Sequence, residues 1–455
     1  MTIHLSFLIP HSSFHINKTL LLPLLILLPL LSSCERESFV RDSGEVTLTF
    51  SNDTISFDTV FTTIGTATKM LTVYNRSDDN LTLSSITLAG GRVSRFRLNV
   101  DGDTTLVAKD VEIESGDSIF VFVQACIDPN DNESPFLVED AIVFSNGQRL
   151  TLQAWGRNAI YHITPRDSAW VRIGSETWGP GQPHVIIGNL LVSEDCTLRM
   201  TAGTEVYLGP DAMLIVDSAA RLVAQGTAEE PVIFSSLRSD GWYSFLPGQW
   251  QTIWFYNYSR NNIIDHAVIE NGTGGLRCYP NAQLTVSNTV IRNMSDAGII
   301  GQGGTISGRN LLVYDCLTSL TVLMGGSYDF RRCTMANYWG YSARKLPTVI
   351  LSNQVQTRNG IVGGDLLQAD FTDCIVWGTY STGELLLSEM EGYAMNHRFN
   401  HSILRGGDWN EDPLFTDPAE DDYTLQEESP AKGLGYQASP PNPLSKGRGG
   451  IIIPH

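Results

Sequence analysis

The feature that most constrains the fold is a 22-residue interval that recurs in the second half of the chain. Three separate series of positions keep this interval: His266, Asn288, Asn310 and Arg332; Leu276, Gly298 and Leu320; and Leu284, Ile306 and Tyr328. A stretch in which three phases share one period is predicted to wind into a solenoid with three strands in each coil.

Stacking explains which side chains each series carries. Equivalent residues of successive coils lie about 4.8 Å apart, so each contacts the residue above it and the residue below it. Inward positions must therefore be apolar or small, and two series fit: Ile269, Ile291, Val313 and Met335, and Ala267, Thr289, Leu311 and Cys333. Asn271, Asn293, Asp315 and Asn337 are predicted to form a column of turns. Stacked side-chain amides hydrogen-bond along the axis of the solenoid, and Asn and Asp tolerate the left-handed backbone that such a turn requires. The sequence therefore predicts a parallel β-helix.

The predicted β-helix runs from residue 185 to residue 436. Before the 22-residue series, apolar pairs begin at every eighth position from Leu190 to Leu222, and three such steps approach the length of one coil. A meander of antiparallel hairpins is the alternative, but the breaks contain few of the Asn-Gly and Asp-Gly pairs that hairpins favour. The segment from Trp339 to Leu367 is predicted to be an insertion, whose PTVILSN motif we expect to add an edge strand.

The rest of the chain divides into shorter segments. Residues 45–157 alternate apolar and polar residues between turn signals, which predicts an immunoglobulin-like β-sandwich and makes the chain all-β. Residues 158–184 are rich in Pro, Gly and Trp and are expected to be a connector, in which Trp170 and Trp178 pin the sandwich to the first coil. The Pro- and Gly-rich residues 437–455 are predicted to be a disordered tail.

Composition narrows the range of partners. The formal net charge of −19 disfavours nucleic acid and other polyanions. The acidic loop from Asp128 to Glu133 offers oxygen ligands for Ca²⁺, but it lacks the glycine and the spaced glutamate of an EF-hand, so a solvated loop is the preferred interpretation. The cysteines other than Cys34 show no CxxC pair and no metal-type spacing, and they are interpreted as buried apolar residues. We predict no cofactor.

Residues 1–34 have the features of an export signal. Lys18 precedes the run TLLLPLLILLPLLSSC, which is too short and too often interrupted by proline for a membrane span but fits the apolar core of a secretory signal. The run ends in LSSC, which resembles the lipobox of bacterial lipoproteins. The resemblance implies that Cys34 is acylated and anchors the exported chain to a lipid bilayer, with the inner membrane, outer membrane and cell surface all open. An ordinary signal peptide with a coincidental cysteine is the alternative.

The second half of the chain resembles the right-handed parallel β-helix, pectin-lyase-like lipoproteins of the bacterial envelope. The resemblance is carried by the 22-residue series and by AGTEVYL, ARLVAQGTAEEPVIFSS, PGQWQTIWF and the closing segment DPLFTDPAEDDYTLQEESPAKGLG. It covers about residues 185–436 and implies the fold without implying an activity. The sandwich segment likewise resembles immunoglobulin-like modules at the base of bacterial envelope proteins.

Several enzymes of this fold cleave polysaccharides, so a polysaccharide lyase or glycoside hydrolase is the alternative function. Such lyases combine an acidic Ca²⁺ cluster with a basic proton acceptor, and the hydrolases use two carboxylates. The candidate residues are Asp265, Glu270, Arg292, Asp296, Asp315, Arg331, Arg332, Asp365, Asp370 and Asp373, and none falls in a catalytic motif. Because Glu270 and Arg292 are separated by the same 22-residue interval, we predict an ion pair between coils in preference to an acid–base pair.

The strongest signal for a binding site is aromatic. The segment DGWYSFLPGQWQTIWFYNYS is dense in rings, which stack on the faces of sugars. Alternation along it assigns Trp250, Thr252, Trp254 and Tyr256 to one face, and the predicted glycan contacts are Trp242, Tyr243, Tyr256 and Tyr258. The alternative is that the rings only seal an edge of the core, with Trp250 and Trp254 inside it.

These observations favour a non-catalytic envelope lipoprotein whose β-helix binds a glycan or another envelope component. A structural or adhesion subunit is a third possibility. The sequence names neither the ligand nor the membrane leaflet.

Lipidation of Cys34 is testable in cells. Replacing the thiol in Cys34→Ala removes the acyl acceptor, so unprocessed precursor should accumulate and incorporation of a labelled fatty acid should be lost. Labelling that is unchanged in the variant would refute the anchor.

Overall fold

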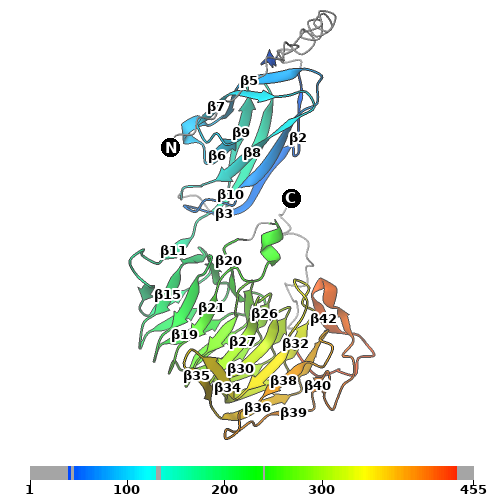
Figure 1. Cartoon of the computed structure of the whole chain (residues 1–455). Helices are drawn as coiled ribbons and strands as arrows, with labels where there is room; N and C mark the ends of the chain where they lie inside the picture. Colours follow the sequence, from blue (N-terminus) through cyan, green and yellow to red (C-terminus); the bar gives the residue numbers. More distant parts are fainter. Residues whose placement is uncertain (1–38, 43–45, 130–134, 239–240, 438–455) are drawn as a thin grey trace, which may run out of the picture. The chain divides into compact units, whose positions relative to one another are not determined.

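The computed structural model describes residues 39–42, 46–129, 135–238 and 241–437, and almost all of its elements are strands (Figure 1). The chain divides into two compact units, of which the first takes residues 1–56, 66–126 and 138–153 and the second takes the rest. Three predicted segments lie outside the described residues: the signal with Cys34, residues 130–133 of the acidic loop, and the tail beyond Gln437. No helix in the described part of the chain is long and apolar enough to cross a membrane.

The N-terminal strands form two sheets. One has the strand order β1 (Phe39–Arg41), β5 (Asn80–Leu88), β9 (Phe136–Phe144), β10 (Arg149–Arg157) and β3 (Thr54–Phe61), with β7 (Val107–Ile113) also paired to β5. The other has the order β2 (Leu48–Phe50), β4 (Lys69–Asn75), β8 (Ser118–Ala125) and β6 (Phe96–Val100). The two sheets are in contact through Phe50 and Phe144, whose ring centroids lie 5.1 Å apart. The predicted β-sandwich is present, and its likeness to immunoglobulin modules stays a prediction.

The residues from Ile160 onward wind through three parallel sheets, here named I, II and III (Figure 1). Sheet I contains β11 (Ile160–Ile163), β14 (His184–Ile187), β17 (Glu205–Leu208), β20 (Val232–Ser236), β23 (Ala267–Glu270), β26 (Val290–Arg292), β29 (Leu312–Tyr314), β32 (Thr334–Asn337), β37 (Ile375–Gly378) and β40 (Ile403–Leu404). Sheet II contains β12 (Val171–Ile173), β15 (Asn189–Val192), β18 (Met213–Val216), β21 (Thr252–Phe255), β24 (Leu276–Cys278), β27 (Ala297–Gln302), β30 (Thr318–Leu323), β33 (Val349–Ser352) and β38 (Leu385–Ser388). Sheet III contains β13 (Glu176–Trp178), β16 (Thr197–Met200), β19 (Arg221–Gln225), β22 (Asn262–Asp265), β25 (Gln283–Ser287), β28 (Thr305–Arg309), β31 (Gly326–Arg331), β36 (Leu366–Thr372) and β39 (Arg398–Asn400). The predicted all-β fold, with a right-handed parallel β-helix of three strands per coil, is confirmed.

The core of the β-helix follows the predicted inward series. Ile269 pairs with Ile291, Ile291 with Val313, and Val313 with Met335, and all four side chains are fully buried. Each side chain therefore packs on one of similar shape in the next coil, which removes apolar surface from water without leaving gaps. The spacing of apolar pairs before this region is confirmed as well, because Leu190 pairs in parallel with Leu214.

From His266 onward, sheets III and I meet at a sharp corner made by one left-handed residue in each coil, whereas longer turns join them in the earlier coils. The corner residues, with φ between 44° and 54°, are His266, Asn288, Asn310, Arg332, Asp373 and His401. Asn310 Nδ2 donates to Asn288 Oδ1 at 2.8 Å, and Asn288 Nδ2 donates to Asp265 Oδ1 at 2.9 Å. The predicted series from His266 is thus a column of corners, in which polar side chains bond from coil to coil.

The second predicted turn column, between sheets I and II, is present in three of its four members. Asn271, Asn293 and Asp315 have positive φ, and Asn293 Nδ2 donates to Asn271 Oδ1 at 3.2 Å. Asn337 departs from the prediction, because it is the buried last residue of β32 and its side chain bonds to backbone groups instead. The chain enters the insertion at this point, so its path differs from that of the other coils.

One predicted series is wrong by a residue. Leu276 pairs with Ile299 rather than with Gly298, and Ile299 pairs with Leu320. The turn before Ile299 is one residue longer than the equivalent turns of the coils on either side. A Cβ atom on Gly298 would lie 2.5 Å from Cγ1 of Val313, so this turn needs a glycine there. The remaining series keeps its predicted register, at Leu284, Ile306 and Tyr328.

The β-helix begins earlier than predicted. The expected connector, residues 158–184, contains β11, β12 and β13, which make the first coil. Of the two tryptophans expected to act as pins, Trp178 is buried in the core of the β-helix, and Trp170 is exposed with the guanidinium of Arg172 over its ring. The three strands are short and the loops beside them contain proline and glycine, so their sequence has the composition of a linker.

The insertion differs from the prediction in a similar way. Its PTVILSN motif forms β33, which lies between β30 and β38 inside sheet II rather than at an edge. The added element is an antiparallel hairpin of β34 (Gln354–Thr357) and β35 (Gly360–Gly363).

The closing segment covers the outer face of sheet I. It contains β41 (Phe415–Asp417) and β42 (Asp422–Leu425), joined by a 3₁₀-helix at Pro418–Glu420. Its apolar side chains Phe415, Tyr423, Ala431 and Leu434 form one buried cluster with outward residues of sheet I. The residues from sheet I are Val290, Leu312, Tyr314, Ala336, Ile375 and Ile403. Sheet I is therefore closed to ligands at these coils.

Two histidines lie inside the first coils of the β-helix. His162 Nε2 and His184 Nδ1 are 3.0 Å apart, and the ring of Trp178 stacks on His184 with a centroid distance of 3.8 Å. Burial, together with the nearby His162, lowers the pKa of His184 to about 4, and burial also lowers the pKa of His162. Both rings are therefore neutral near pH 7.

The inward series predicts a large cost for a charge in the core. Ile291→Asp places a carboxylate between Ile269 and Val313 without a partner, and it should lower the free energy of unfolding by at least about 3 kcal/mol. Ile291→Val, which removes one methyl group, should cost only about 1 kcal/mol. Urea unfolding of both variants measures the difference; equal, small costs would contradict the inward placement.

Acid should weaken the β-helix through the histidine pair. A histidine of the unfolded chain titrates near pH 6.5, whereas His184 titrates near 4 when folded, so the unfolded state binds the proton first. The free energy of unfolding should be constant above about pH 6.5 and fall by up to about 3 kcal/mol between there and pH 4. Unfolding curves across this range should be flatter for His184→Phe; parallel curves for the two proteins would count against the idea.

Candidate functional site

The aromatic segment places its rings according to the strand that carries it. In β21, Ile253 and Phe255 are fully buried and point into the core, whereas Trp254 and the following Tyr256 point outward from sheet II. The predicted alternation is correct for these residues. Trp250 departs from it, because it precedes the strand, is fully buried, and donates its indole Nε1 to the carbonyl oxygen of Glu270 at 2.8 Å.

Three outward rings from two adjacent coils meet on sheet II, and we call Trp254, Tyr256 and Tyr279 the aromatic cluster. The centroid of Trp254 lies 5.5 Å from that of Tyr256 and 4.8 Å from that of Tyr279, both edge to face. Tyr256 and Tyr279 are nearly parallel, with centroids 6.1 Å apart. Tyr256 is 40% exposed, and the other two are half-buried, so the cluster presents ring surface to solvent on a rigid sheet.

Unpaired polar atoms surround this cluster. Three buried side-chain atoms here have no hydrogen-bond partner among the described residues: Trp254 Nε1, Asn257 Oδ1 and Arg277 Nε. Arg277 pairs with Trp254 in the next coil, and Asn257 is three residues along the chain from Trp254. An unpaired buried polar group costs about 1–3 kcal/mol, so each of these atoms is expected to bond to a buried water or to a ligand.

A carboxylate completes the site. Asp296, at the turn before β27, has its pKa raised by partial burial, while the nearby positive charge of Arg277 lowers it. The site therefore combines flat rings with two donors, the Trp254 indole and the Arg277 guanidinium, and with two acceptors, the Asn257 amide oxygen and the Asp296 carboxylate. Groups of this kind, on a fixed scaffold, bind a polyhydroxylated ligand by stacking and hydrogen bonding.

The four glycan contacts predicted from the sequence do not all lie together in the structure. Tyr243 is exposed in the 3₁₀-helix Gly241–Phe245, which precedes β21, and the guanidinium of Arg238 lies over its ring. Tyr258 follows β21 and is 60% exposed. The two residues therefore precede and follow the strand in the chain, and neither belongs to the aromatic cluster. The side chain of Trp242 lies outside the described part of the chain.

Sequence reasoning missed Tyr279 and Arg277, because they lie one coil after the aromatic segment. The coil spacing contained the signal, since Tyr279 follows Tyr256 by the same interval that separates Arg277 from its strand partner Trp254.

Glu270 and Arg292 form the predicted ion pair between coils. Arg292 Nε and Nη2 donate to Glu270 Oε2 at 2.9 and 2.7 Å, and Nη1 donates to Tyr314 Oη at 2.9 Å. Burial alone would lower the pKa of Arg292, but Tyr314 and Glu270 outweigh it and raise the pKa. Arg292 Nη1 also lies 3.9 Å from Asp421 of the closing segment. The pair is enclosed and structural.

The other catalytic candidates have local structural partners. Those partners are Ser287 for Asp265, Tyr338 for Asp315, Asp329 for Arg331, Ala394 for Asp365, Arg398 for Asp370 and His401 for Asp373. Arg332 is a corner residue with positive φ. No group of three or more metal-ligating side chains occurs among the described residues.

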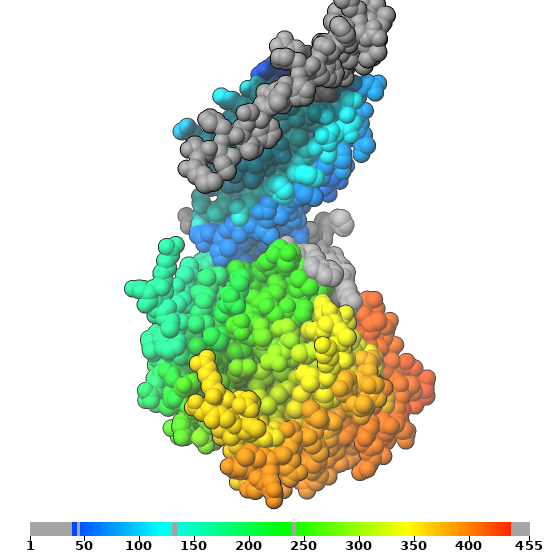
Figure 2. Space-filling model, viewed as in Figure 1, coloured from blue at the N-terminus to red at the C-terminus, as the bar shows by residue number. Residues whose placement is uncertain are grey.

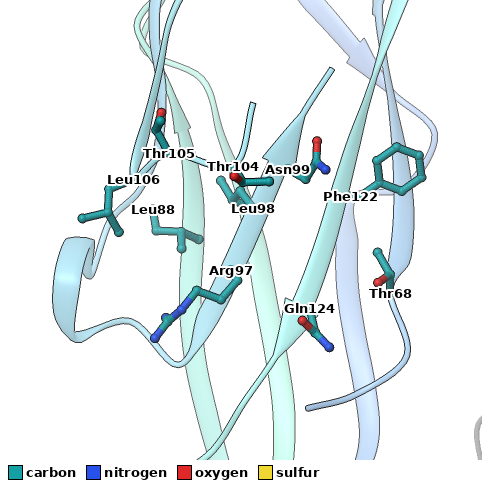
Figure 3. A pocket seen from close by; sticks show the side chains of 10 residues that line it. All are labelled: Thr68, Leu88, Arg97, Leu98, Asn99, Thr104, Thr105, Leu106, Phe122 and Gln124. Atoms are coloured by element: carbon teal, nitrogen blue, oxygen red, sulfur yellow. The ribbon is translucent and has the colours of Figure 1, made fainter. Parts of the chain in front are cut away.

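A concave surface separate from the aromatic cluster lies in the sandwich. It has a volume of about 610 Å³, opens beside β6, and is lined by Leu88, Leu98, Leu106, Phe122 and several threonine and amide side chains (Figure 3). Arg97 is the one ionisable residue of its lining, so this hollow lacks the acid and base that catalysis requires.

Comparison with known proteins does not assign the chain. No protein-family profile and no curated protein matches it. Among solved structures, a variant of the catalytic domain of GH87 alpha-1,3-glucanase in complex with tetrasaccharides aligns over 73% of this chain and 82% of its own, at 10% identity and a TM-score of 0.21. The same catalytic domain in complex with nigerose aligns over 74% of this chain and 78% of its own, at 11% identity and a TM-score of 0.19. Similarity at these TM-scores supports no conclusion about activity.

The ion pair makes a prediction that separates structure from catalysis. Arg292→Ala leaves Glu270 without its partner beneath the closing segment and should destabilise the fold by about 3 kcal/mol. The double variant Glu270→Leu/Arg292→Met replaces both charges by apolar groups and should recover most of that loss. Thermal unfolding measures both. An Arg292→Ala chain of unchanged stability that had lost a lyase activity would overturn the structural assignment.

Proposed function

We propose that the β-helix is a non-catalytic glycan-binding domain and that its site is the aromatic cluster with Asn257, Arg277 and Asp296. The observation that carries the proposal is the coincidence of three outward rings, one exposed and two half-buried, with three nearby polar atoms that have no hydrogen-bond partner among the described residues. Rings without such atoms would suit an apolar partner, and unpaired atoms without rings would suit water.

Each group has a role that sugar chemistry explains. Tyr256 and Tyr279 offer ring faces on which the C–H face of a sugar stacks. The Trp254 indole and the Arg277 guanidinium donate to hydroxyl oxygens, and Asn257 Oδ1 accepts from a hydroxyl, once a small side-chain movement exposes these buried atoms. Because these groups lie on strands of the β-helix, ligand binding orders few additional side chains, which limits the entropic cost of association.

Charge selects the kind of glycan. Asp296 lies at the site, and the chain has a formal net charge of −19. Polyuronates and other anionic chains would therefore be repelled, and a neutral polysaccharide is the expected ligand. One guanidinium, already close to Asp296, does not reverse this preference.

The rest of the chain fits a role at the cell envelope. We propose that Cys34 is acylated and anchors the exported protein to a bilayer, so that the β-helix is held where polysaccharides accumulate. The LSSC motif and the preceding apolar run support this part of the proposal.

Glycoside hydrolysis is the second candidate, and the raised pKa of Asp296 favours it, because a general acid must hold its proton. Hydrolysis needs a second carboxylate about 5–10 Å away. The charged partner that the structure gives Asp296 is Arg277, which favours binding over cleavage.

Glycan arrays of neutral and anionic polysaccharides, including α-1,3-glucan, test the proposal on the chain from Glu35 onward. Tyr256→Ala/Tyr279→Ala should weaken binding to a neutral glycan at least about tenfold and keep the melting temperature, because both rings are already partly exposed. Phe120→Ala, which removes an exposed ring of the sandwich, is the matched control and should bind normally.

Two results would reject the binding role. One is unchanged affinity in the double tyrosine variant. The other is release of reducing ends from the bound glycan, abolished by Asp296→Asn, which would establish the hydrolase instead.

A further inference from the structure

Exposed apolar side chains gather where the β-helix ends. The last two coils and their loops contain six large apolar residues that are at least 40% exposed: Ile361, Val362, Leu367, Leu386, Leu387 and Tyr393. They lie on more than one face, because Leu386 and Leu387 are adjacent in β38 and point to opposite sides of sheet II. Figure 2 shows this end of the second unit in yellow and orange at the bottom of the view.

The core itself reaches the surface at this end. Leu387 pairs with the fully buried Leu351 and so belongs to an inward column, yet it is 43% exposed. Phe399 stacks on the buried Phe371 with a centroid distance of 4.4 Å and is only partly covered. The closing segment packs on the outer face of sheet I rather than across this end.

The terminal strands also present unpaired backbone. Sheets II and III end with β38 and β39. The carbonyl oxygens of Glu384 and Ser388 accept bonds from the preceding coil, so by the alternation of a parallel ladder the N–H and C=O groups of Leu385 and Leu387 face away from it. The same parity directs the backbone of Phe399 outward, because Asn400 O accepts from Asp373 N. Exposed edges of this kind pair readily with another strand.

We propose that this end is a dimer interface, on which a second copy of the chain docks end to end through a two-fold axis perpendicular to the β-helix. A second copy presents strand edges with the same spacing and arrangement. The two-fold operation places β38 antiparallel to β38 of the partner and brings the edge of sheet III opposite the end of sheet I. The apolar cores of the two copies then become continuous.

Charge complementarity supports the two-fold arrangement. Arg398 lies on the terminal strand of sheet III with its side chain 63% exposed, and its Nε and Nη2 atoms donate to Asp370 of the preceding coil. Asp408 and Glu411, both exposed, follow the terminal strand of sheet I. The proposed axis brings the Nη1 group of Arg398, which does not bond to Asp370, toward Asp408 and Glu411 of the other copy, once on each side, and this favours one orientation of the copies. A head-to-tail stack would instead leave one end open and produce a series of oligomers.

Sedimentation equilibrium on the chain from Glu35 onward tests the proposal. Twice the mass of one chain is expected at micromolar concentration. Leu387→Asp should give the monomer mass and keep the far-UV circular dichroism spectrum of the folded chain, because the side chain is 43% exposed in a single chain. Leu106→Asp, at an equally exposed leucine of the sandwich, should leave the dimer intact. A monomer at 100 µM, or a dimer that survives Leu387→Asp, would overturn the interface.

Two further variants test the orientation. Arg398→Glu should weaken dimerisation at least tenfold, and adding Asp408→Arg and Glu411→Arg should restore it. In the two-fold arrangement Leu387→Cys lies near its own copy, so mild oxidation with copper phenanthroline should give a disulfide-linked dimer, whereas Leu106→Cys should not. Failure of the charge exchange together with an open-ended series of oligomers would reject the two-fold arrangement. These readouts do not involve glycan, so they are independent of the proposed binding function.

Discussion

Backbone pairing between parallel strands is the constraint on which the rest of this molecule depends. It fixes the separation of successive coils at about 4.8 Å, and at that distance every side chain must tolerate its counterpart above and below. The inward columns therefore hold residues of similar size, such as Ile269, Ile291 and Val313, and the corner columns hold side chains that bond along the axis. Cohesion comes from many equivalent contacts between neighbours, so no single coil forms a complete core alone.

The same constraint explains how far the fold was readable from the sequence. A repeat with one-residue corners makes the period strict, and the series from His266 and Ile269 were predicted in full for that reason. Errors arose where the turns between strands vary in length. One additional residue displaced Gly298 from its expected pairing, and the first coil was mistaken for a connector because its strands are short and separated by proline and glycine.

The candidate site was less accessible to sequence reasoning, since it depends on which residues different coils place side by side. The aromatic segment was conspicuous, but its density of rings did not reveal that Trp250 is core and that Tyr243 and Tyr258 lie beyond the two ends of β21. Tyr279 and Arg277 join the site through register alone. Unpaired polar atoms such as Trp254 Nε1 have no signature in a sequence, because being unpaired is a property of packing.

The single-residue corner between sheets III and I has a consequence for how such a molecule can change over generations. From His266 onward this edge has no loop to lengthen, so an added residue there would move the side chains of the strand that follows to the opposite face of its sheet. The other two edges contain the long excursions, between β32 and β33 and between β33 and β36. The edge between sheets III and I is thus expected to keep a constant length, whereas the other two edges can acquire new loops and, with them, new specificities.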